Sequence, residues 1–431
     1  MIIKDKHLSI NKDASGIFKY ISNISEFDRI KPHEIIFVDK FLLKSDGFLN
    51  VYKIVRRGAA AIITTVGGKT DHSTVVTVEF GIPRLLIPED NKTLHKIRNY
   101  SGTYVFLEKN CFILGKKNGP RKNPSLLYNN IAIPHTRHKV KINLGFPELI
   151  EKYPELVDIS DGVGLLRLEF ILLRVLDGLH PNLYIKKFGI KKYVNEISNT
   201  LERIVLPFAK KNKEVWIRTN DFSPYDLLEL QGGDKEILER NPALGYRGIF
   251  RSLQEQKTML IPEILAIKKL VQKGYSNIGI FPPMTRFIKE YIQWKHIIKI
   301  NRLREVKFGI TIETPSVALT FENFIPYIDF ALFGSNDLTQ FTLALDRSDP
   351  RLQPYFQEDA KAVLKLFERV ITLSKKNKIT TSIGGQAGSN WKILEKLLDF
   401  GILETSVSPQ PNIVREMKKR IYLKEIKTHK K

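Results

Sequence analysis

Eight apolar, β-rich runs that alternate with longer amphipathic stretches constrain the fold of this chain more than any other feature of its sequence. Strands that alternate with helices form parallel βαβ units. Eight such units in succession predict a closed (β/α)8 barrel of the TIM type rather than an open sheet. The amphipathic stretch 363–377 is predicted to be one of its wall helices. The runs occupy residues 138–145, 162–170, 214–221, 276–283, 307–314, 328–337, 380–386 and 404–409.

The part of the chain before the barrel has a different pattern of apolar residues. Short apolar runs at 34–41, 59–65, 84–88 and 103–108 are separated by turns, as in a small α/β domain. Residues 115–125, GKKNGPRKNPS, replace apolar periodicity with Gly, Pro, Asn and charge, which is typical of a linker. We therefore predict a small α/β domain over residues 1–120 and the barrel over residues 121–431.

Composition narrows the cellular context. The charged start MIIKDKHLSI does not resemble a signal peptide, and no segment reaches the roughly 20 uncharged apolar residues that cross a bilayer. The only cysteine, Cys111, cannot form an intrachain disulfide, and its apolar surroundings favour a buried core thiol. These features predict a cytoplasmic protein in a reducing compartment, without a membrane partner.

The formal net charge of +23 raises the question of an anionic partner. The lysines are spread along the chain in short clusters, without the interleaved aromatic residues of an RNA-binding signature. This distribution argues against nucleic acid and favours a solvated, lysine-rich surface. Phosphate-bearing small substrates and unspecific polyanion binding remain the alternatives.

Polar residues stand at or just beyond the ends of several predicted strands: Arg167, Arg218, Glu313, Asn336 and Asp337. The carboxyl ends of the strands of a (β/α)8 barrel meet around one pocket, where active sites of this fold are built. We therefore expect these side chains to share one rim. The alternative is that strand ends are polar only because they emerge into water.

The residue types on this rim suit a phosphorylated acid. Arginine matches carboxylate and phosphate oxygens with a planar fork, so Arg167, Arg218 and Arg247 are candidates to hold a small dianion. Glu313 and Asp337 offer the hard carboxylate oxygens that Mg²⁺ prefers, and Asn336 can position a phosphoryl group. Ordinary barrel salt bridges are the competing interpretation.

The stretch GGKTDHSTVVTVEFGIP, residues 67–83, places His72 at the expected start of a short helix closed by Gly81, with Pro83 beyond it. Free backbone N–H groups and the helix dipole would favour a phosphoryl group on that imidazole, and Thr70 could fix the ring. Such a nucleophile carries a covalent intermediate. A helix-capping or buried histidine is the alternative.

Seven motifs together resemble the enzymes that use phosphoenolpyruvate (PEP), and phosphoenolpyruvate synthases most of all. The resemblance runs in the same order over nearly the whole chain. The motifs are GGKTDHSTVVTVEFGIP, DGVGLLRLEF, VWIRTNDFSPYDLLELQGG, NPALGYRGIFRSL, TIETPSVAL, FGSNDLTQFTLALDR and IGGQAGS.

This resemblance implies a swivelling phosphohistidine domain that carries a phosphoryl group on His72, followed by a barrel that binds PEP or pyruvate. It implies that the substrate is held by Arg167, Arg218 and Arg247. It implies that Mg²⁺ is bound by Glu313 and Asp337, and that the loop of Gly334, Ser335 and Asn336 touches the substrate.

Two departures from the family pattern bear on function. The chain starts within the linker that leads to the swivelling domain and shows no Gly-rich nucleotide loop, so it is not expected to charge His72 from ATP alone. It would work poorly, or with a separate nucleotide-binding subunit. The family's cysteine before the Gly-Gln pair, which moves the substrate's carbon proton, is Gly384 here. The resemblance also implies a homodimer through the barrel. A phosphotransferase to a hydroxyl acceptor and a non-catalytic PEP-binding protein are the alternatives to a PEP synthase-like phosphotransferase.

Overall fold

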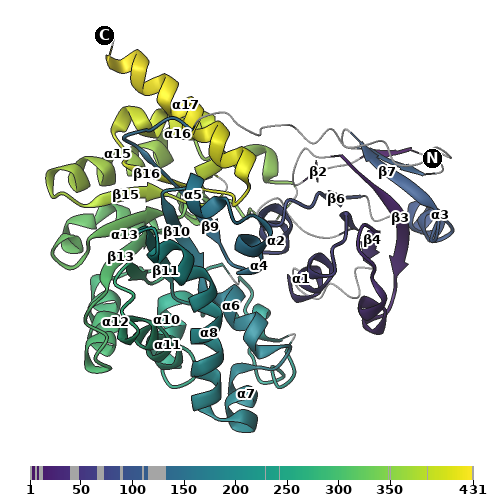
Figure 1. Cartoon of the computed structure of the whole chain (residues 1–431), viewed down its shortest axis with the longest axis horizontal. Helices are drawn as coiled ribbons and strands as arrows, with labels where there is room; N and C mark the ends of the chain where they lie inside the picture. Colours follow the sequence, from purple (N-terminus) through teal and green to yellow (C-terminus); the bar gives the residue numbers. More distant parts are fainter. Residues whose placement is uncertain are drawn as a thin grey trace. The chain divides into compact units, whose positions relative to one another are not determined.

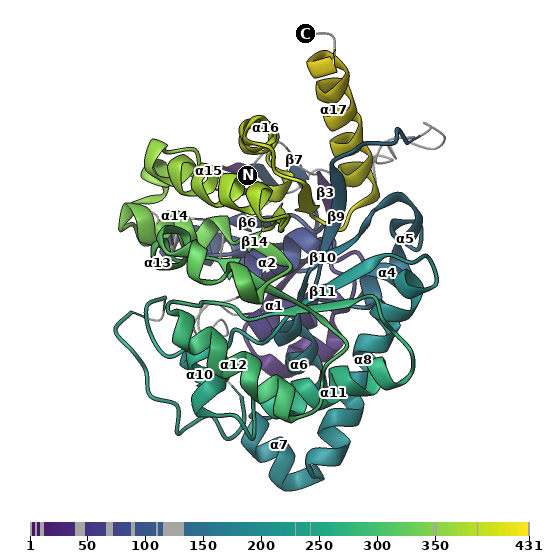
Figure 2. The same ribbon diagram turned by 90° about the vertical axis from the view of Figure 1, so that its left-hand side faces the viewer.

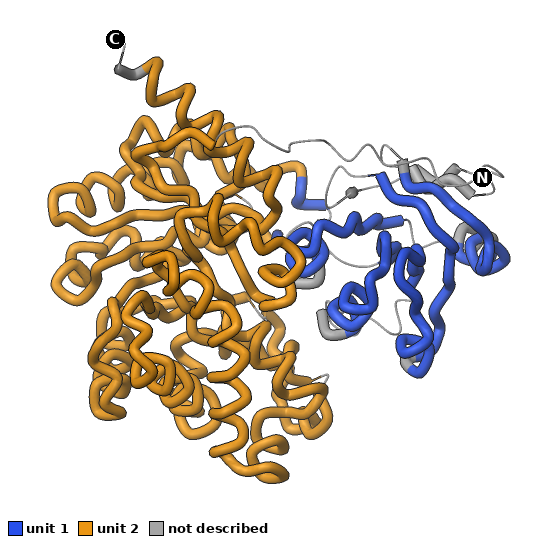
Figure 3. Tube along the Cα trace, in the orientation of Figure 1, with its two compact units in different colours: residues 1–131, 347–353 blue, residues 132–346, 354–431 orange. Residues whose placement is uncertain are grey.

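A computed structural model shows two α/β bodies in one chain (Figure 1). Contacts within the chain divide it into unit 1, residues 1–131 and 347–353, and unit 2, residues 132–346 and 354–431 (Figure 3). The predicted boundary near residue 120 falls outside the described residues. The structure describes residues 2–4, 7–8, 13–38, 48–65, 72–87, 91–108, 111–114, 133–228, 230–241, 243–347, 349, 351–385 and 387–429.

Unit 1 is built on an eight-stranded sheet in the order β1-β8-β7-β3-β4-β5-β6-β2. The pairs that join β3 to β6 are parallel, and the outer pairs are antiparallel. The strands are β1 (Ile2–Lys4), β2 (His7–Leu8), β3 (Ala14–Ile21), β4 (Ile35–Val38), β5 (Ala61–Thr64), β6 (Arg84–Leu86), β7 (Tyr104–Glu108) and β8 (Cys111–Leu114). The four apolar runs predicted as the framework of this domain thus form β4, β5, β6 and β7.

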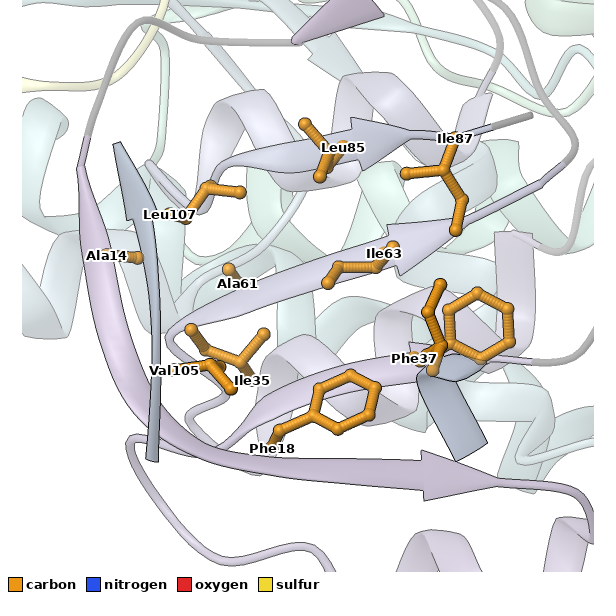
Figure 4. Packing of buried hydrophobic residues seen from close by; sticks show 11 residues of the cluster. Ala14, Phe18, Ile35, Phe37, Ala61, Ile63, Leu85, Ile87, Val105 and Leu107 are labelled. Atoms are coloured by element: carbon orange, nitrogen blue, oxygen red, sulfur yellow. The ribbon is translucent and has the colours of Figure 1, made fainter. Parts of the chain in front are cut away.

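The helical elements of unit 1 are η1 (Ile24–Arg29), α1 (Phe48–Arg56), α2 (His72–Glu79) and α3 (Asn91–Arg98). Figure 4 shows the apolar core, where Phe18, Phe37 and Ile63 meet side chains from β6 and β7. β-branched and aromatic residues suit these strands because they pack on a pleated surface with little loss of rotamer freedom. Cys111 begins β8, but its side chain lies outside the described residues.

Unit 2 is a closed barrel in which β9 to β16 follow each other in chain order and β16 pairs with β9. All eight pairings are parallel. The predicted (β/α)8 fold is therefore confirmed, and each of the eight runs supplies one strand. The strands are β9 (Lys139–Leu144), β10 (Gly162–Arg167), β11 (Glu214–Arg218), β12 (Ile278–Phe281), β13 (Lys307–Ile312), β14 (Phe330–Phe333), β15 (Thr380–Ile383) and β16 (Glu404–Val407).

Helices surround this barrel, as Figure 2 shows for α8, α11, α12 and α15. They are α4 (Glu148–Lys152), α5 (Leu156–Ile159), α6 (Leu168–Leu176), α7 (Pro181–Phe188), α8 (Ile190–Ala209), α9 (Pro224–Leu228), α10 (Gly248–Gln254), α11 (Leu260–Gln272), α12 (Ile288–Ile300), α13 (Pro315–Leu319), α14 (Ser335–Leu343), α15 (Lys361–Lys376), α16 (Trp391–Phe400) and α17 (Pro411–His429), with short 3-10 turns η3 (Phe321–Asn323), η4 (Ile325–Tyr327), η5 (Gln353–Tyr355) and η6 (Ala387–Ser389). The predicted wall helix is α15. Within the described part of the chain, no helix has the length and apolarity that crossing a membrane requires.

The barrel interior changes character along its axis. At the amino ends of the strands, the buried Lys141 Nζ lies 2.8 Å from Glu214 Oε2 and 2.7 Å from Glu404 Oε2. Further along lies an apolar cluster of Leu165, Trp216, Phe281, Phe330 and Leu332. The carboxyl ends of the strands, where active sites of this fold are built, lie beyond these two levels.

His138, which precedes β9, makes the barrel sensitive to acid. Its Nδ1 lies 3.1 Å from the Ile402 carbonyl oxygen and therefore donates to it, while burial lowers the pKa of the imidazole to about 4. Because this pKa lies below that of histidine in the unfolded chain, the unfolded state takes up a proton first as the pH falls. The contribution of neutral His138 to the free energy of unfolding is therefore full above pH 6.5 and is lost as the pH falls through 4. At 1.36 kcal/mol per pKa unit, we expect this loss to be about 3 kcal/mol.

We expect His138→Gln, which cannot take up this proton, to lose less stability than wild type between pH 7 and pH 4. Urea unfolding of both proteins at the two pH values measures the difference. Equal losses in both would contradict the assignment to His138.

Candidate active site at the carboxyl end of the barrel

Arg167 and Arg218 end neighbouring strands, and register pairs them directly between β10 and β11. Both are buried, although arginine rarely is without partners. Arg218 Nη2 donates a hydrogen bond to Glu169 Oε1. Burial alone would lower the pKa of Arg218, but Glu169, Asp221 and Glu313 outweigh it and raise that pKa. Arg167 and Arg218 thus lie at the predicted rim, and the neighbouring carboxylates keep the Arg218 guanidinium charged.

Asp221, which sequence reasoning missed, joins two of the predicted arginines. Its carboxylate accepts from Arg247 Nε at 3.1 Å and from Arg247 Nη2 at 2.6 Å. The same carboxylate lies 3.6 Å from Arg218 Nη1. Arg247 immediately precedes α10 and reaches the rim from a loop rather than from a strand end. A signal was available, since Asp221 follows Arg218 by three residues at one strand end.

Glu313 and Asp337 follow β13 and β14, which are neighbours in the barrel. Glu313 Oε1 lies 3.5 Å from Arg218 Nη1, and Asp337 Oδ1 lies 3.6 Å from Arg247 Nη1. The Met284 backbone N–H also donates to Glu313 at 2.7 Å. The structure therefore brings together four of the residues that the sequence placed on one rim.

The loop after β14 carries the other predicted contacts. Gly334 is required by packing, because a Cβ there would stand 2.4 Å from Glu313 Cγ. Ser335 and Asn336 open α14, and neither Ser335 Oγ nor Asn336 Oδ1 has a hydrogen-bond partner among the described residues. These groups have hydrogen-bonding capacity left for a ligand at the rim.

The donor set on this rim fits a divalent cation. Burial raises the pKa of Glu313, and the carboxylates of Asp337 and Asp221 raise it further, so a positive ion beside Glu313 would offset repulsion. No group of three or more His, Cys, Asp or Glu side chains suited to a metal occurs among the residues described. Mg²⁺ is commonly bound by one or two protein carboxylates, with water and substrate oxygens completing its octahedron.

A second buried carboxyl group that the sequence analysis missed holds the residue next to Asp221 by hydrogen bonds. Glu263 on α11 accepts hydrogen bonds from the Asn220 side chain and, at 3.3 Å, from the Asn220 backbone N–H. Burial raises the pKa of Glu263 to about 8, which favours its protonated form. This pair fixes the residue just before Asp221. An acid among the apolar residues LIPEILAI was the available signal.

His72 is the first residue of α2, as the sequence predicted. Gly81 adopts φ 66°, and the N–H of Ile82 donates to the Thr77 carbonyl at 2.8 Å, which closes the helix where expected. Thr70 and the side chain of His72 lie outside the described residues. The predicted hydrogen bond between them therefore stays a prediction.

Arg84, also missed from the sequence, anchors the start of α2. Its Nη1 donates to Thr74 Oγ1 at 3.0 Å and its Nε to Thr64 Oγ1 at 3.2 Å. Because Arg84 is buried on β6 and Thr64 ends β5, the first turn of α2 is tied to two strands. These hydrogen bonds thus hold the start of the helix that begins at His72 in place within unit 1.

Gly384 directly follows β15, and its N–H donates to the Phe333 carbonyl at 3.1 Å. A Cβ built here would contact Leu165 Cδ2 and Leu332 Cδ1, each at 3.3 Å. Its φ lies outside the left-handed region, unlike that of Gly385 at 72°. A small side chain is therefore compatible with the backbone at position 384.

Comparison with known proteins agrees with this geometry. Residues 125–425 match the family model of the PEP-utilising enzyme, PEP-binding domain. The chain is 34% identical to a probable phosphoenolpyruvate synthase of Archaeoglobus fulgidus, over 96% of this chain and 54% of that protein. It is also 34% identical to the phosphoenolpyruvate synthase of Pyrococcus furiosus, over 96% of this chain and 50% of that protein.

A probable phosphoenolpyruvate synthase of Methanocaldococcus jannaschii is 39% identical over 63% of this chain and 23% of its own length. The chain spans about half the length of the first two relatives. The similarity runs through both units, and the family model covers the barrel that carries the clustered arginines and carboxylates. The chain therefore belongs to the family of PEP-utilising enzymes.

Proposed function

We propose that this protein is a phosphoenolpyruvate synthase-like phosphotransferase, which exchanges a phosphoryl group between His72 and a PEP or pyruvate molecule bound at the barrel rim. The observation that supports it best is the buried cluster in which Asp221 links Arg218 to Arg247 beside Glu313 and Asp337. Contacts to the substrate would come from Arg167, Arg218, Arg247, Glu313, Gly334, Ser335, Asn336 and Asp337. In this proposal residues 1–120 act as the swivelling domain and residues 121–431 as the barrel.

In the proposed reaction the bond between phosphorus and the bridging oxygen of PEP breaks, and the phosphoryl group passes to a ring nitrogen of His72. The enolate that remains gains a proton at its third carbon and becomes pyruvate. The arginine forks hold the phosphate and carboxylate oxygens in place, since bidentate pairs fix orientation as well as charge. The carboxylates that pair with them hold the forks in position.

Glu313 and Asp337 would hold Mg²⁺. When bound, the ion would offset the negative charge of the phosphoryl group and orient its oxygens. We expect removal of Mg²⁺ by a chelator to abolish PEP binding measured by calorimetry. Equal affinity for PEP with and without Mg²⁺ would contradict the assignment of Glu313 and Asp337 as Mg²⁺ ligands.

His72→Ala is expected to remove all phosphorylation of the protein. Incubation of the full chain with PEP labelled in its phosphoryl group, together with Mg²⁺, should place acid-labile label on wild type. The variant should keep the melting temperature of wild type, because the start of a helix adds little to the core. If a folded His72→Ala protein still takes up the label, His72 is not the residue that carries the phosphoryl group.

The family resemblance suggests two macromolecular partners for this reaction. A nucleotide-binding subunit would charge His72 from ATP, and a second copy of the chain would pair through the barrel in the cytoplasm. ATP-dependent labelling after mixing with such a subunit, and light scattering of the purified chain, test these two partners. Glycine at position 384 favours one other candidate, phosphoryl transfer to a hydroxyl acceptor, because that reaction needs no proton at carbon.

A further inference from the structure

Three consecutive barrel strands, β15, β16 and β9, direct polar side chains into the interior. Lys141 and Glu404 meet inside the barrel, and residues two positions apart on a strand point the same way. Asn143 and Ser406 therefore also face inward. Ser382 does so as well, because register pairs it with Glu404.

These three side chains are buried, yet part of their hydrogen-bonding capacity is unused. Among the residues that the structure describes, Asn143 Oδ1, Ser382 Oγ and Ser406 Oγ have no hydrogen-bond partner. The opposite side of the interior, from Leu165 round to Leu332, is apolar. Buried polar atoms of this kind are usually satisfied by ordered water. The interior thus has one polar side, below the rim, that is suited to binding water.

This polar side lies beside Gly384. Asn143 Nδ2 donates to the Gly385 carbonyl at 3.3 Å. Gly384 is the next inward position after Ser382, and it directly follows the pairing of Ile383 with Thr405. Gly384 adds no side chain of its own between these groups and the rim, and the side chains nearest to its Cβ position are Leu165 and Leu332.

We propose that water held by Ser406, Ser382 and Asn143 protonates the third carbon of the enolate left by PEP. This inference rests on the proposed function. Once the phosphoryl group has left, the enolate's electron pair takes a proton from this water and forms the C–H bond of pyruvate. The hydroxide that remains regains a proton from solvent through the serine hydroxyls, so one solvent proton is consumed. Run backwards, the same route exchanges the methyl protons of pyruvate with solvent.

The test is the exchange of pyruvate methyl protons in D₂O, followed by proton NMR with the full chain and Mg²⁺. A positioned acid typically contributes 10²- to 10⁴-fold, so Ser406→Ala is expected to slow exchange by about 10²-fold. The double variant Ser382→Ala/Ser406→Ala should slow it at least as much. Labelling of His72 by PEP should stay within a few-fold of wild type, because phosphoryl transfer needs no carbon proton.

Ser374→Ala is the matched control, since Ser374 on α15 is another buried hydroxyl without a partner among the described residues. It should change neither readout. In the Gly384→Cys background, Ser406→Ala should slow exchange less than twofold, because the thiol would then supply the proton. Normal labelling with exchange unchanged in Ser406→Ala, or absent from wild type, would overturn the water route and leave the proposed function standing. Exchange that depends on Ser406 without any labelling by PEP would support the water route and contradict the phosphotransfer.

Discussion

Gly384→Cys is expected to raise the rate of pyruvate formation from PEP by about 10²-fold, because a positioned thiol would replace water as the proton donor. This gain corresponds to about 2.7 kcal/mol of barrier. The backbone allows the change, since φ at 384 is not left-handed and a Cβ would press only on the flexible ends of Leu165 and Leu332. Coupled detection of pyruvate under single-turnover conditions measures the rate.

Gly384→Ala is the control for this prediction, because it adds the same Cβ without an acid. It should give no gain in rate, and its melting temperature shows what the contacts with the two leucines cost. If a folded Gly384→Cys protein is no faster than wild type, proton transfer does not limit the reaction. Transfer to a hydroxyl acceptor and PEP binding without turnover then become the better interpretations.

Arg218→Ala is expected to lower the free energy of unfolding by about 3–5 kcal/mol, the usual cost of leaving buried charges without their partner. The guanidinium is hydrogen-bonded to Glu169 and lies within 3.6 Å of both Asp221 and Glu313. All three carboxylates are buried, so water cannot replace the lost charge. Chemical denaturation measures the change. PEP affinity should fall at least tenfold in the variant, from the loss of a charge-assisted contact.

Arg203→Ala provides the matched control. Arg203 pairs on the surface with Glu151, where Arg203 is partly and Glu151 largely exposed, and such a pair contributes only about 0–1 kcal/mol. Comparable destabilisation by the two substitutions would show that Arg218 is not held in a buried carboxylate cluster. Arg218→Lys, which keeps the charge and loses the fork, should restore part of the stability and little of the PEP affinity.

The rim was largely predictable because a parallel barrel brings all carboxyl strand ends together, whatever their separation in sequence. Arg218, Glu313 and Asp337 stand at or just beyond the ends of three apolar runs, and that position was enough to place them near one another. Arg247 was harder, because it reaches the cluster from a loop. The helix that starts at His72 was also predictable, since Gly81 and Pro83 mark its end in the sequence.

The sequence by itself thus determined the elements of this protein: eight strand-and-helix repeats after a small α/β domain, with charged residues at strand ends. Only the tertiary structure decided which charges meet. Asp221 pairs with Arg218 three residues before it and with Arg247 from a later loop, and the register between β15 and β16 brings Ser382 beside Glu404. The physical reason is that strand periodicity is local, whereas the pairing of buried charges and hydroxyls depends on contacts between residues far apart in the chain.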